Sequence, residues 1–136
     1  MARLYYLLNV AQHRLGKRAK RECEEQLGVT AAQLGALFIV DEQPGLRQNA
    51  LAEGLSCNKS AVTALVERLS ERELIERSPC PDDGRATRLR LTRRGKRTVE
   101  KGRPMVARLQ DRLTDGFSRA EMQTVARFLR ATIERF

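Results

Sequence analysis

The chain has few of the residues that support cysteine or histidine chemistry. Its 136 residues include three cysteines, one histidine and no tryptophan. Cys23, Cys57 and Cys80 are odd in number, widely spaced and never part of a CxxC pair, so we expect neither a disulfide scaffold nor a structural zinc site. His13 stands alone, which leaves no plausible Cys–His catalytic pair. We therefore predict no metal and no cofactor.

Motifs typical of enzymes and membrane proteins are also missing. The chain has no glycine-rich phosphate loop, no HExxH and no GxSxG, so we predict that it is not an enzyme. No run approaches the roughly 20 apolar residues that a membrane-spanning helix needs. The apolar stretch at residues 4–8 is too short for a signal peptide. We expect a cytoplasmic protein without a membrane partner, folded as a single domain over residues 1–136.

Positive charge is abundant and unevenly placed. The net charge is +9, which favours a polyanionic partner such as nucleic acid. Residues 56–97 carry 11 basic and six acidic side chains, against seven and six in residues 1–55, and no acid occurs from residue 85 to residue 97. A solvated basic face is the simpler interpretation, but this cluster adjoins a helix-turn-helix pattern.

Helical spacing and capping signals divide the chain. Leucines at helical spacing predict a first helix over about residues 4–27, which Gly28 ends. Thr30 and Gln33 form a capping box that starts a second helix, ended by Pro44 and Gly45. Two long helices are predicted after residue 92, the second opened by a capping box at residues 118–121. The terminal segments, 1–28 and 98–136, carry more apolar surface than a small core can cover, which favours dimerisation.

The segment 30–97 contains the pattern of a winged helix-turn-helix. A short helix over about residues 48–54 is followed by a tight turn and by Asn58, a good N-cap for the next helix. Two β-like stretches, 74–77 and 88–91, flank a loop over residues 78–87 that is dense in Pro, Asp and Gly. The predicted fold is therefore mainly α with a small β-hairpin wing, and its core is flanked by N- and C-terminal dimerisation helices.

Each part of this pattern offers candidate contacts to double-stranded DNA. An α-helix fits the major groove with its N-terminal residues at the base edges, while the preceding helix braces against the backbone. An arginine at a hairpin tip suits the narrow minor groove. Arg68 is ambiguous, because it could instead pair with Glu71 or Glu73. The candidates are Asn58, Lys59, Ser60, Thr63, Ala64 and Arg68 on the recognition helix, Gln48 and Asn49 on the bracing helix, and Asp83, Arg85, Arg88 and Arg90 on the wing.

These residues resemble the multiple-antibiotic-resistance regulator (MarR) family. The resemblance rests on Leu51–Leu55, Asn58–Leu69 and Leu74–Arg77, and on the Asp83-Gly84-Arg85 signature followed by Leu91-Thr92-Arg93-Arg94-Gly95. It implies a homodimer, formed by the first and the last two helices, that binds a pseudo-palindromic operator as a repressor. It also implies release by a small aromatic or anionic effector.

Two positions depart from the family pattern. Glu73 stands where such proteins commonly have glycine, at the end of the recognition helix. Ala64 replaces an arginine or other polar residue, so the base preference cannot be transferred.

Two switching hypotheses remain open. Oxidation of Cys57, which precedes the recognition helix, or of Cys80 in the wing loop would distort the DNA-reading unit; the alternative is that both are incidental cysteines. Tyr5, Tyr6 and His13 are the candidates for a ligand pocket, although tyrosine at such positions more often packs a dimer. The rival functions are a nonspecific architectural DNA-binding protein and a winged-helix protein-interaction module.

Overall fold

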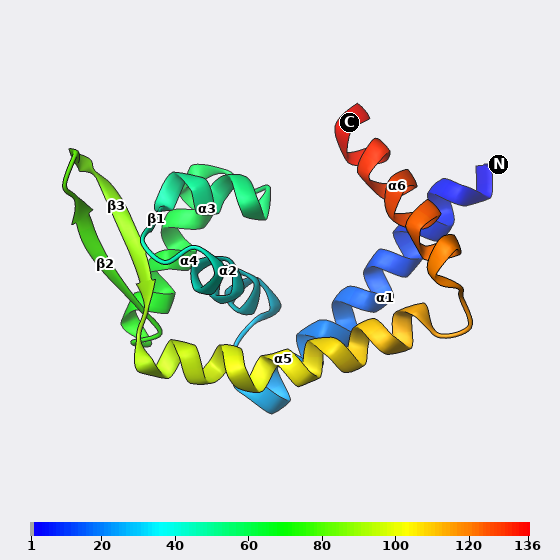
Figure 1. Cartoon of the computed structure of the whole chain (residues 1–136), viewed down its shortest axis with the longest axis horizontal. Helices are drawn as coiled ribbons and strands as arrows, with labels where there is room; N and C mark the ends of the chain where they lie inside the picture. Colours follow the sequence, from blue (N-terminus) through cyan, green and yellow to red (C-terminus); the bar gives the residue numbers. More distant parts are fainter. Residues whose placement is uncertain (1) are drawn as a thin grey trace. The chain divides into compact units, whose positions relative to one another are not determined.

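The computed structural model describes residues 2–136 and divides between Arg103 and Pro104 into two compact units. The elements, shown in Figure 1, are α1 (Ala2–Leu27), α2 (Ala31–Glu42), β1 (Leu46–Arg47), α3 (Gln48–Leu55), α4 (Lys59–Glu71), β2 (Ile75–Cys80), β3 (Asp83–Leu91), α5 (Arg93–Thr114) and α6 (Arg119–Arg135). Helix α5 runs through the boundary between the units. The predicted mainly α-helical fold with a β-hairpin wing is confirmed.

The turn between α1 and α2 forms as predicted. Gly28 follows α1 with a φ of +66°, in the left-handed region that glycine adopts most readily. The Thr30 hydroxyl accepts a hydrogen bond from the backbone N–H of Gln33 at 3.0 Å, and the Gln33 side chain accepts one from the N–H of Thr30 at 3.1 Å. This capping box satisfies two amides that would otherwise lack partners at the helix start.

Helices α3 and α4 form the predicted helix-turn-helix. Ser56 ends α3 in a left-handed conformation, and the Asn58 side chain then caps α4 by accepting from the N–H of Ala61 at 2.8 Å. The apolar side of α4 is buried through Val62, Val66 and Leu69. The opposite side, which begins with short polar side chains, is exposed. One face therefore anchors the helix and leaves the other free to contact a partner.

The wing belongs to a three-stranded antiparallel sheet in the order β1-β3-β2. In Figure 1 the β2–β3 hairpin projects from the helices at the left of the view. The two-residue β1, which sequence analysis did not predict, pairs Leu46 with Leu89 and Arg47 with Arg88. Alternation within β3 buries Leu89 and exposes Arg90.

The predicted loop over residues 78–87 is wrong in extent. Strand β2 continues to Cys80 and β3 begins at Asp83, so only residues 81–82 form the turn. Pro79 lacks a backbone donor but is tolerated, because β2 lies at the edge of the sheet. Pro79 pairs with Thr87 while Cys80 pairs with Asp83, so residues 84–86 bulge from β3. Arg85 lies in this bulge rather than in a loop.

A compact joint around Thr92 connects the end of the recognition helix with the sheet and the start of α5. The Thr92 hydroxyl accepts from the N–H of Gly95 at 3.0 Å, which caps the start of α5, and donates to the Glu73 carbonyl at 2.6 Å. The Thr92 N–H donates to the Leu74 carbonyl at 3.1 Å. A side chain at Gly95 would overlap this same carbonyl oxygen. The joint therefore depends on a residue without a Cβ.

Glu73 occupies a conformation that favours glycine. Its φ is +57°, which costs an L-residue about 1–2 kcal/mol, and its side chain is exposed. Glycine relieves that strain but loses more backbone entropy on folding. We expect Glu73→Gly to raise the free energy of unfolding by about 0.5–1 kcal/mol, measured by urea denaturation.

The matched control is Glu71→Gly, two residues earlier in the last turn of α4. At that position glycine only lowers the helix propensity, so we expect the free energy of unfolding to fall by about 0.5–1 kcal/mol. A loss of stability in both variants would contradict the assignment of strain to Glu73.

The first half of α5 packs closely on its own unit. Gly102 is buried, and a Cβ there would lie 3.1 Å from a Leu34 methyl and 3.3 Å from a Leu27 methyl. Arg103 forms an ion pair with Asp41 of α2, and its guanidinium lies 5.7 Å from the centre of the Phe38 ring. These contacts hold α5 against α2.

The second unit, from Pro104 onward, has an apolar surface but little interior. A capping box between Ser118 and Glu121 opens α6, as predicted. No residue of α6 is buried within the chain. Its exposed large apolar side chains are Val125, Phe128, Leu129 and Ile133. The helix therefore carries an apolar face that the chain itself does not cover.

Candidate nucleic-acid interface

The N-terminal half of α4 presents the polar face predicted for base contacts. Lys59, Ser60, Thr63 and Ala64 are all exposed. The Ser60 hydroxyl donates to the Asn58 side chain at 2.9 Å, so the cap also orients the serine. The Thr63 hydroxyl donates to the Lys59 carbonyl at 2.8 Å. These short side chains leave room for a groove to approach the helix.

Gln48 and Thr63 link the bracing helix to the recognition helix. The Gln48 amide donates to the Thr63 hydroxyl at 3.3 Å. Sequence analysis placed Gln48 at a phosphate and Thr63 at a base but did not predict this contact. Arg68 is exposed on α4, and within residues 2–136 it forms no ion pair with Glu71 or Glu73. Its guanidinium therefore stays available for an external anion.

The bulge of β3 holds Arg85 through its backbone. The Asp83 carboxylate accepts from the backbone N–H of Arg85 at 3.0 Å. The arginine side chain is exposed, so Asp83 shapes the bulge rather than gripping the guanidinium.

A small basic hollow lies between the wing and the start of α3. It measures about 100 Å³ and is lined by Arg47, Gln48, Asn49, Arg85, Ala86 and Thr87. The structure therefore brings the bracing-helix candidates together with Arg85. Arg47, which the sequence analysis missed, adds a second guanidinium. Its only signal in the sequence was its place just before a predicted helix.

Arg88 is held within the sheet region, whereas Arg90 is exposed. The Arg88 Nη1 donates to the Gly45 carbonyl at 3.4 Å, and its side chain is half-buried. A hydrogen bond from Arg88 also lowers the pKa of the Cys80 thiol, with a further contribution from the backbone at Asp82. The predicted contact of Arg88 with DNA stays a prediction, and part of its guanidinium already bonds within the wing.

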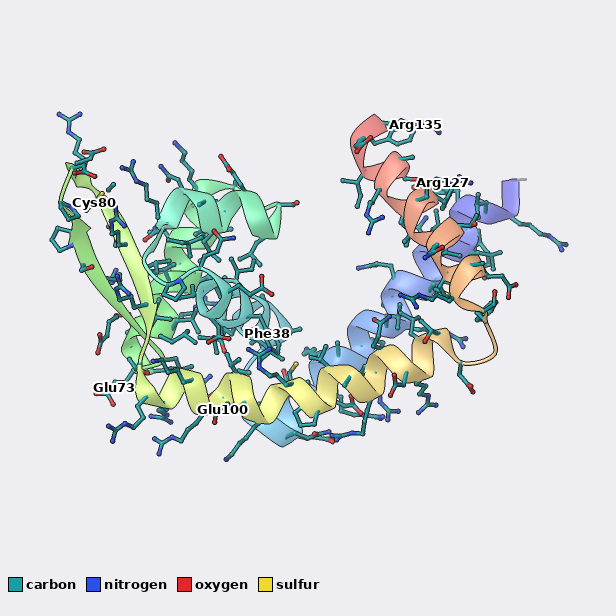
Figure 2. All side chains as sticks on the ribbon, in the orientation of Figure 1. Phe38, Glu73, Cys80, Glu100, Arg127 and Arg135 are labelled. Carbon is teal, nitrogen blue, oxygen red and sulfur yellow. The ribbon has the colours of Figure 1, made fainter. Side chains whose placement is uncertain are left out.

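The three cysteines are in different environments. Cys80 is buried at the end of β2, near the hairpin tip in Figure 2, and not in a loop. Cys57 is exposed, and its Sγ donates to the Leu55 carbonyl at 3.4 Å. Burial raises the pKa of the Cys23 thiol, and nearby Glu22 raises it further. Cys80 therefore has the thiol best placed to ionise, and Cys57 the one most open to solvent.

The predicted ligand-pocket residues lie on one exposed stretch of α1. Tyr5 is 77% exposed, Tyr6 is 64% exposed, and His13 is also exposed. No hollow described for this chain is lined by any of them. A pocket at these residues would need a second surface to close it.

Residues 2–136 contain no group of three or more His, Cys, Asp or Glu side chains placed to hold a metal ion. None of their helices has the length and apolar character needed to cross a membrane.

Comparison with known proteins agrees with this geometry. A sequence profile described as the MarR family matches residues 29–87. The transcriptional repressor CouR, in a crystal structure with a 23-mer DNA duplex, is 32% identical, has a TM-score of 0.84 and is matched over 96% of this chain and 92% of its own. The S. aureus MepR–DNA complex is 25% identical, with a TM-score of 0.90 and 97% of each chain covered.

Curated sequences extend the similarity to named regulators. The HTH-type transcriptional repressor IacR of Pseudomonas putida is 28% identical over 93 residues, which cover 68% of this chain and 56% of IacR. The matches span between 48% and 64% of the length of the curated relatives. The names of these proteins describe transcription regulators and not enzymes, in agreement with the sequence-based prediction.

Proposed function

This chain belongs to the MarR family, and from that premise we propose that it is a sequence-specific, double-stranded DNA-binding repressor of transcription. The observation that carries the proposal is the shared surface of α3, α4 and the wing. It presents exposed short polar side chains on α4 beside a basic hollow that contains Arg47 and Arg85. The repressor role is supported by the names of CouR and IacR.

In this proposal each element of the surface has its own role. The N-terminal half of α4 enters the major groove, where Ser60 and Thr63 hydrogen-bond to base edges and Ala64 contacts a thymine methyl. Gln48 and Asn49 face phosphates, and Arg47 adds a charge there. Arg85 enters the adjacent minor groove, whose electronegative potential attracts guanidinium groups.

The active assembly is a homodimer. Each unit carries uncovered apolar side chains: Leu4, Leu7 and Leu15 on α1 of the first unit, and the apolar face of α6 in the second. Burial of such surface is the main favourable term in protein association. A twofold dimer repeats the reading surface, so the operator is pseudo-palindromic with half-sites about 34–36 Å apart.

Release from the operator has two candidate triggers. A small aromatic or anionic effector is the first, and Tyr5, Tyr6 and His13 would need a partner surface to enclose it. The second is oxidation of Cys80, whose thiolate is stabilised by Arg88 within the wing. A hydroperoxide would convert that thiolate to a sulfenate and release water or an alcohol. Because Cys80 is buried, the added oxygen would displace neighbouring atoms. We expect this displacement to distort the hairpin that presents Arg85.

The Cys80–Arg88 contact gives a pH-dependent prediction. Since the hydrogen bond from Arg88 favours the thiolate, Cys80 is expected to ionise at a lower pH than an ordinary thiol. Thiolate ultraviolet absorbance, followed against pH in a Cys23→Ala, Cys57→Ser background, measures the midpoint. Arg88→Met should move it to higher pH. An unchanged midpoint would show that Arg88 does not stabilise the thiolate.

The experiment that tests the proposed function is binding to the DNA that flanks the protein's own gene, at increasing salt and with random duplex as competitor. We expect affinity to fall steeply with salt, because phosphate contacts release counterions. We also expect a preference of about 10³–10⁷ for the operator. Equal binding to both duplexes would support an architectural protein, and no binding at low salt would support a protein-interaction module.

A further inference from the structure

A second basic hollow lies within the first unit, away from the DNA-reading surface. It measures about 340 Å³, within the range of small-molecule sites. The C-terminal end of α1 and the first half of α5 form its walls. The lining residues are Gln26, Leu27, Arg94, Arg97, Thr98 and Lys101. It therefore has three cationic side chains, an amide, a hydroxyl and one apolar side chain, but no carboxylate.

The three cations lie together on α5 without an ion pair among the described residues, and Arg94 and Arg97 also border a hollow lined by Glu73 and Glu76. Arg94, Arg97 and Lys101 share one side of α5, since they are three and four residues apart. All three are exposed, and within residues 2–136 none forms an ion pair with a carboxylate. Like charges at this spacing destabilise a helix. An anion between them would remove that repulsion.

Operator DNA on the reading surface would not reach this hollow. The base-reading end of α4 is at Ser60, and the 13-residue helix rises about 20 Å from there to its C-terminal end. Arg85 lies near the tip of the nine-residue β3, which extends about 30 Å. Figure 2 shows Cys80 near that tip and Glu73 at the opposite, basal end. Arg94 and Arg97 line the basal end together with Glu73.

The hollow adjoins the end of the recognition helix. A neighbouring hollow of about 470 Å³ shares Arg94 and Arg97 and is also lined by Ser70 and Glu73, at the end of α4. On the other side, Arg72 at the C-cap of α4 donates to the Gln33 side chain at 3.1 Å. Arg72 also lies 3.9 Å from the Cβ position of Gly28, two residues beyond Gln26.

We propose that Arg94, Arg97 and Lys101 bind a small polyanion with two or more phosphate or carboxylate groups, and that its binding changes DNA affinity through the C-terminal end of α4. The three cations favour at least two negative charges, and charge-assisted hydrogen bonds from arginine suit both phosphate and carboxylate. The volume of the hollow, about 340 Å³, suits a small molecule better than a duplex. Binding of the polyanion does not depend on the proposed function, whereas its effect on DNA affinity rests on that function.

The test is isothermal titration calorimetry with pyrophosphate as the phosphate probe and citrate as the carboxylate probe, at constant ionic strength. Wild-type protein is compared with Arg94→Gln, Arg97→Gln. The matched control, Lys20→Gln, Arg21→Gln, removes the same charge from exposed positions on α1. We expect saturable binding of at least one probe, with one site per chain. The dissociation constant should rise at least tenfold in the Arg94, Arg97 variant and stay unchanged in the control.

Two results would overturn the binding site: no saturable binding of either probe to the wild type, or equal loss of affinity in both double variants. The coupling is tested by titrating the bound probe into the operator complex. A change in operator affinity that disappears in the Arg94, Arg97 variant supports it, and an unchanged affinity refutes it. Failure of DNA binding itself would refute the proposed function and leave the calorimetric result intact.

Discussion

Replacing Gly95 by alanine is expected to lower the free energy of unfolding by at least about 3 kcal/mol. The new methyl group would overlap the Leu74 carbonyl oxygen, which is backbone and cannot rotate away. The same carbonyl accepts the Thr92 N–H. Relief of the overlap therefore separates the start of α5 from the end of the recognition helix and breaks this hydrogen bond. Urea denaturation followed by circular dichroism measures the loss.

Gly16→Ala is the matched control, because it makes the same substitution in α1 where no atom beyond the adjoining helix backbone lies within 4 Å of the new Cβ. Alanine is the better helix former, so we expect a gain of about 0.5–1 kcal/mol. Equal effects of the two substitutions would mean that the joint at Thr92 tolerates a side chain.

Arg85→Ala is expected to weaken operator binding by about 1–3 kcal/mol, the usual scale of a specific arginine contact. Arg85 is exposed in the β3 bulge, and the Asp83 carboxylate holds its backbone in place. Removal of the side chain leaves that backbone contact intact, so folding and assembly should not change. Fluorescence anisotropy with labelled operator measures the affinity, and sedimentation measures the assembly.

The charge-matched control for this variant is Arg21→Ala, at an exposed position on α1. It removes one positive charge away from the proposed reading surface, so operator affinity should change little at moderate salt. Equal losses in both variants would indicate that Arg85 acts only through net charge and does not enter a groove.

The helix-turn-helix could be predicted because its signals are local. The Asn58 cap and the i, i+3, i+4, i+7 spacing from Val62 act within one helix, and neither needs a distant partner. The hairpin was harder to predict. Its strand β2 includes Pro79, which argues against a strand until the sheet order places β2 at an edge. Strand β1 has only two residues and exists through pairing with β3.

The residues of the candidate interface also divide into those that local sequence can place and those that only the tertiary fold can place. Exposure of Ser60 and Thr63 follows from helical periodicity, so sequence analysis could place them on the polar face. The Gln48–Thr63 hydrogen bond joins residues 15 positions apart, and the hollow that unites Arg47 with Arg85 joins residues 38 positions apart. Folding places Arg88, a predicted DNA contact, near Gly45 and Cys80, which local sequence could not show, and its contact with DNA stays a prediction. Contacts of this range depend on the tertiary fold and not on local sequence.

If the chain forms the proposed homodimer, the uncovered apolar face of α6 makes the stability of the protein depend on its own concentration. A helix with no buried residue gains little from the chain that contains it, because packing supplies most helical stability in proteins. In the proposed homodimer that packing comes from association, so the melting temperature should rise with protein concentration. Dilution of the protein below the dissociation constant of this dimer would then unfold the terminal helix and release the operator without any chemical signal.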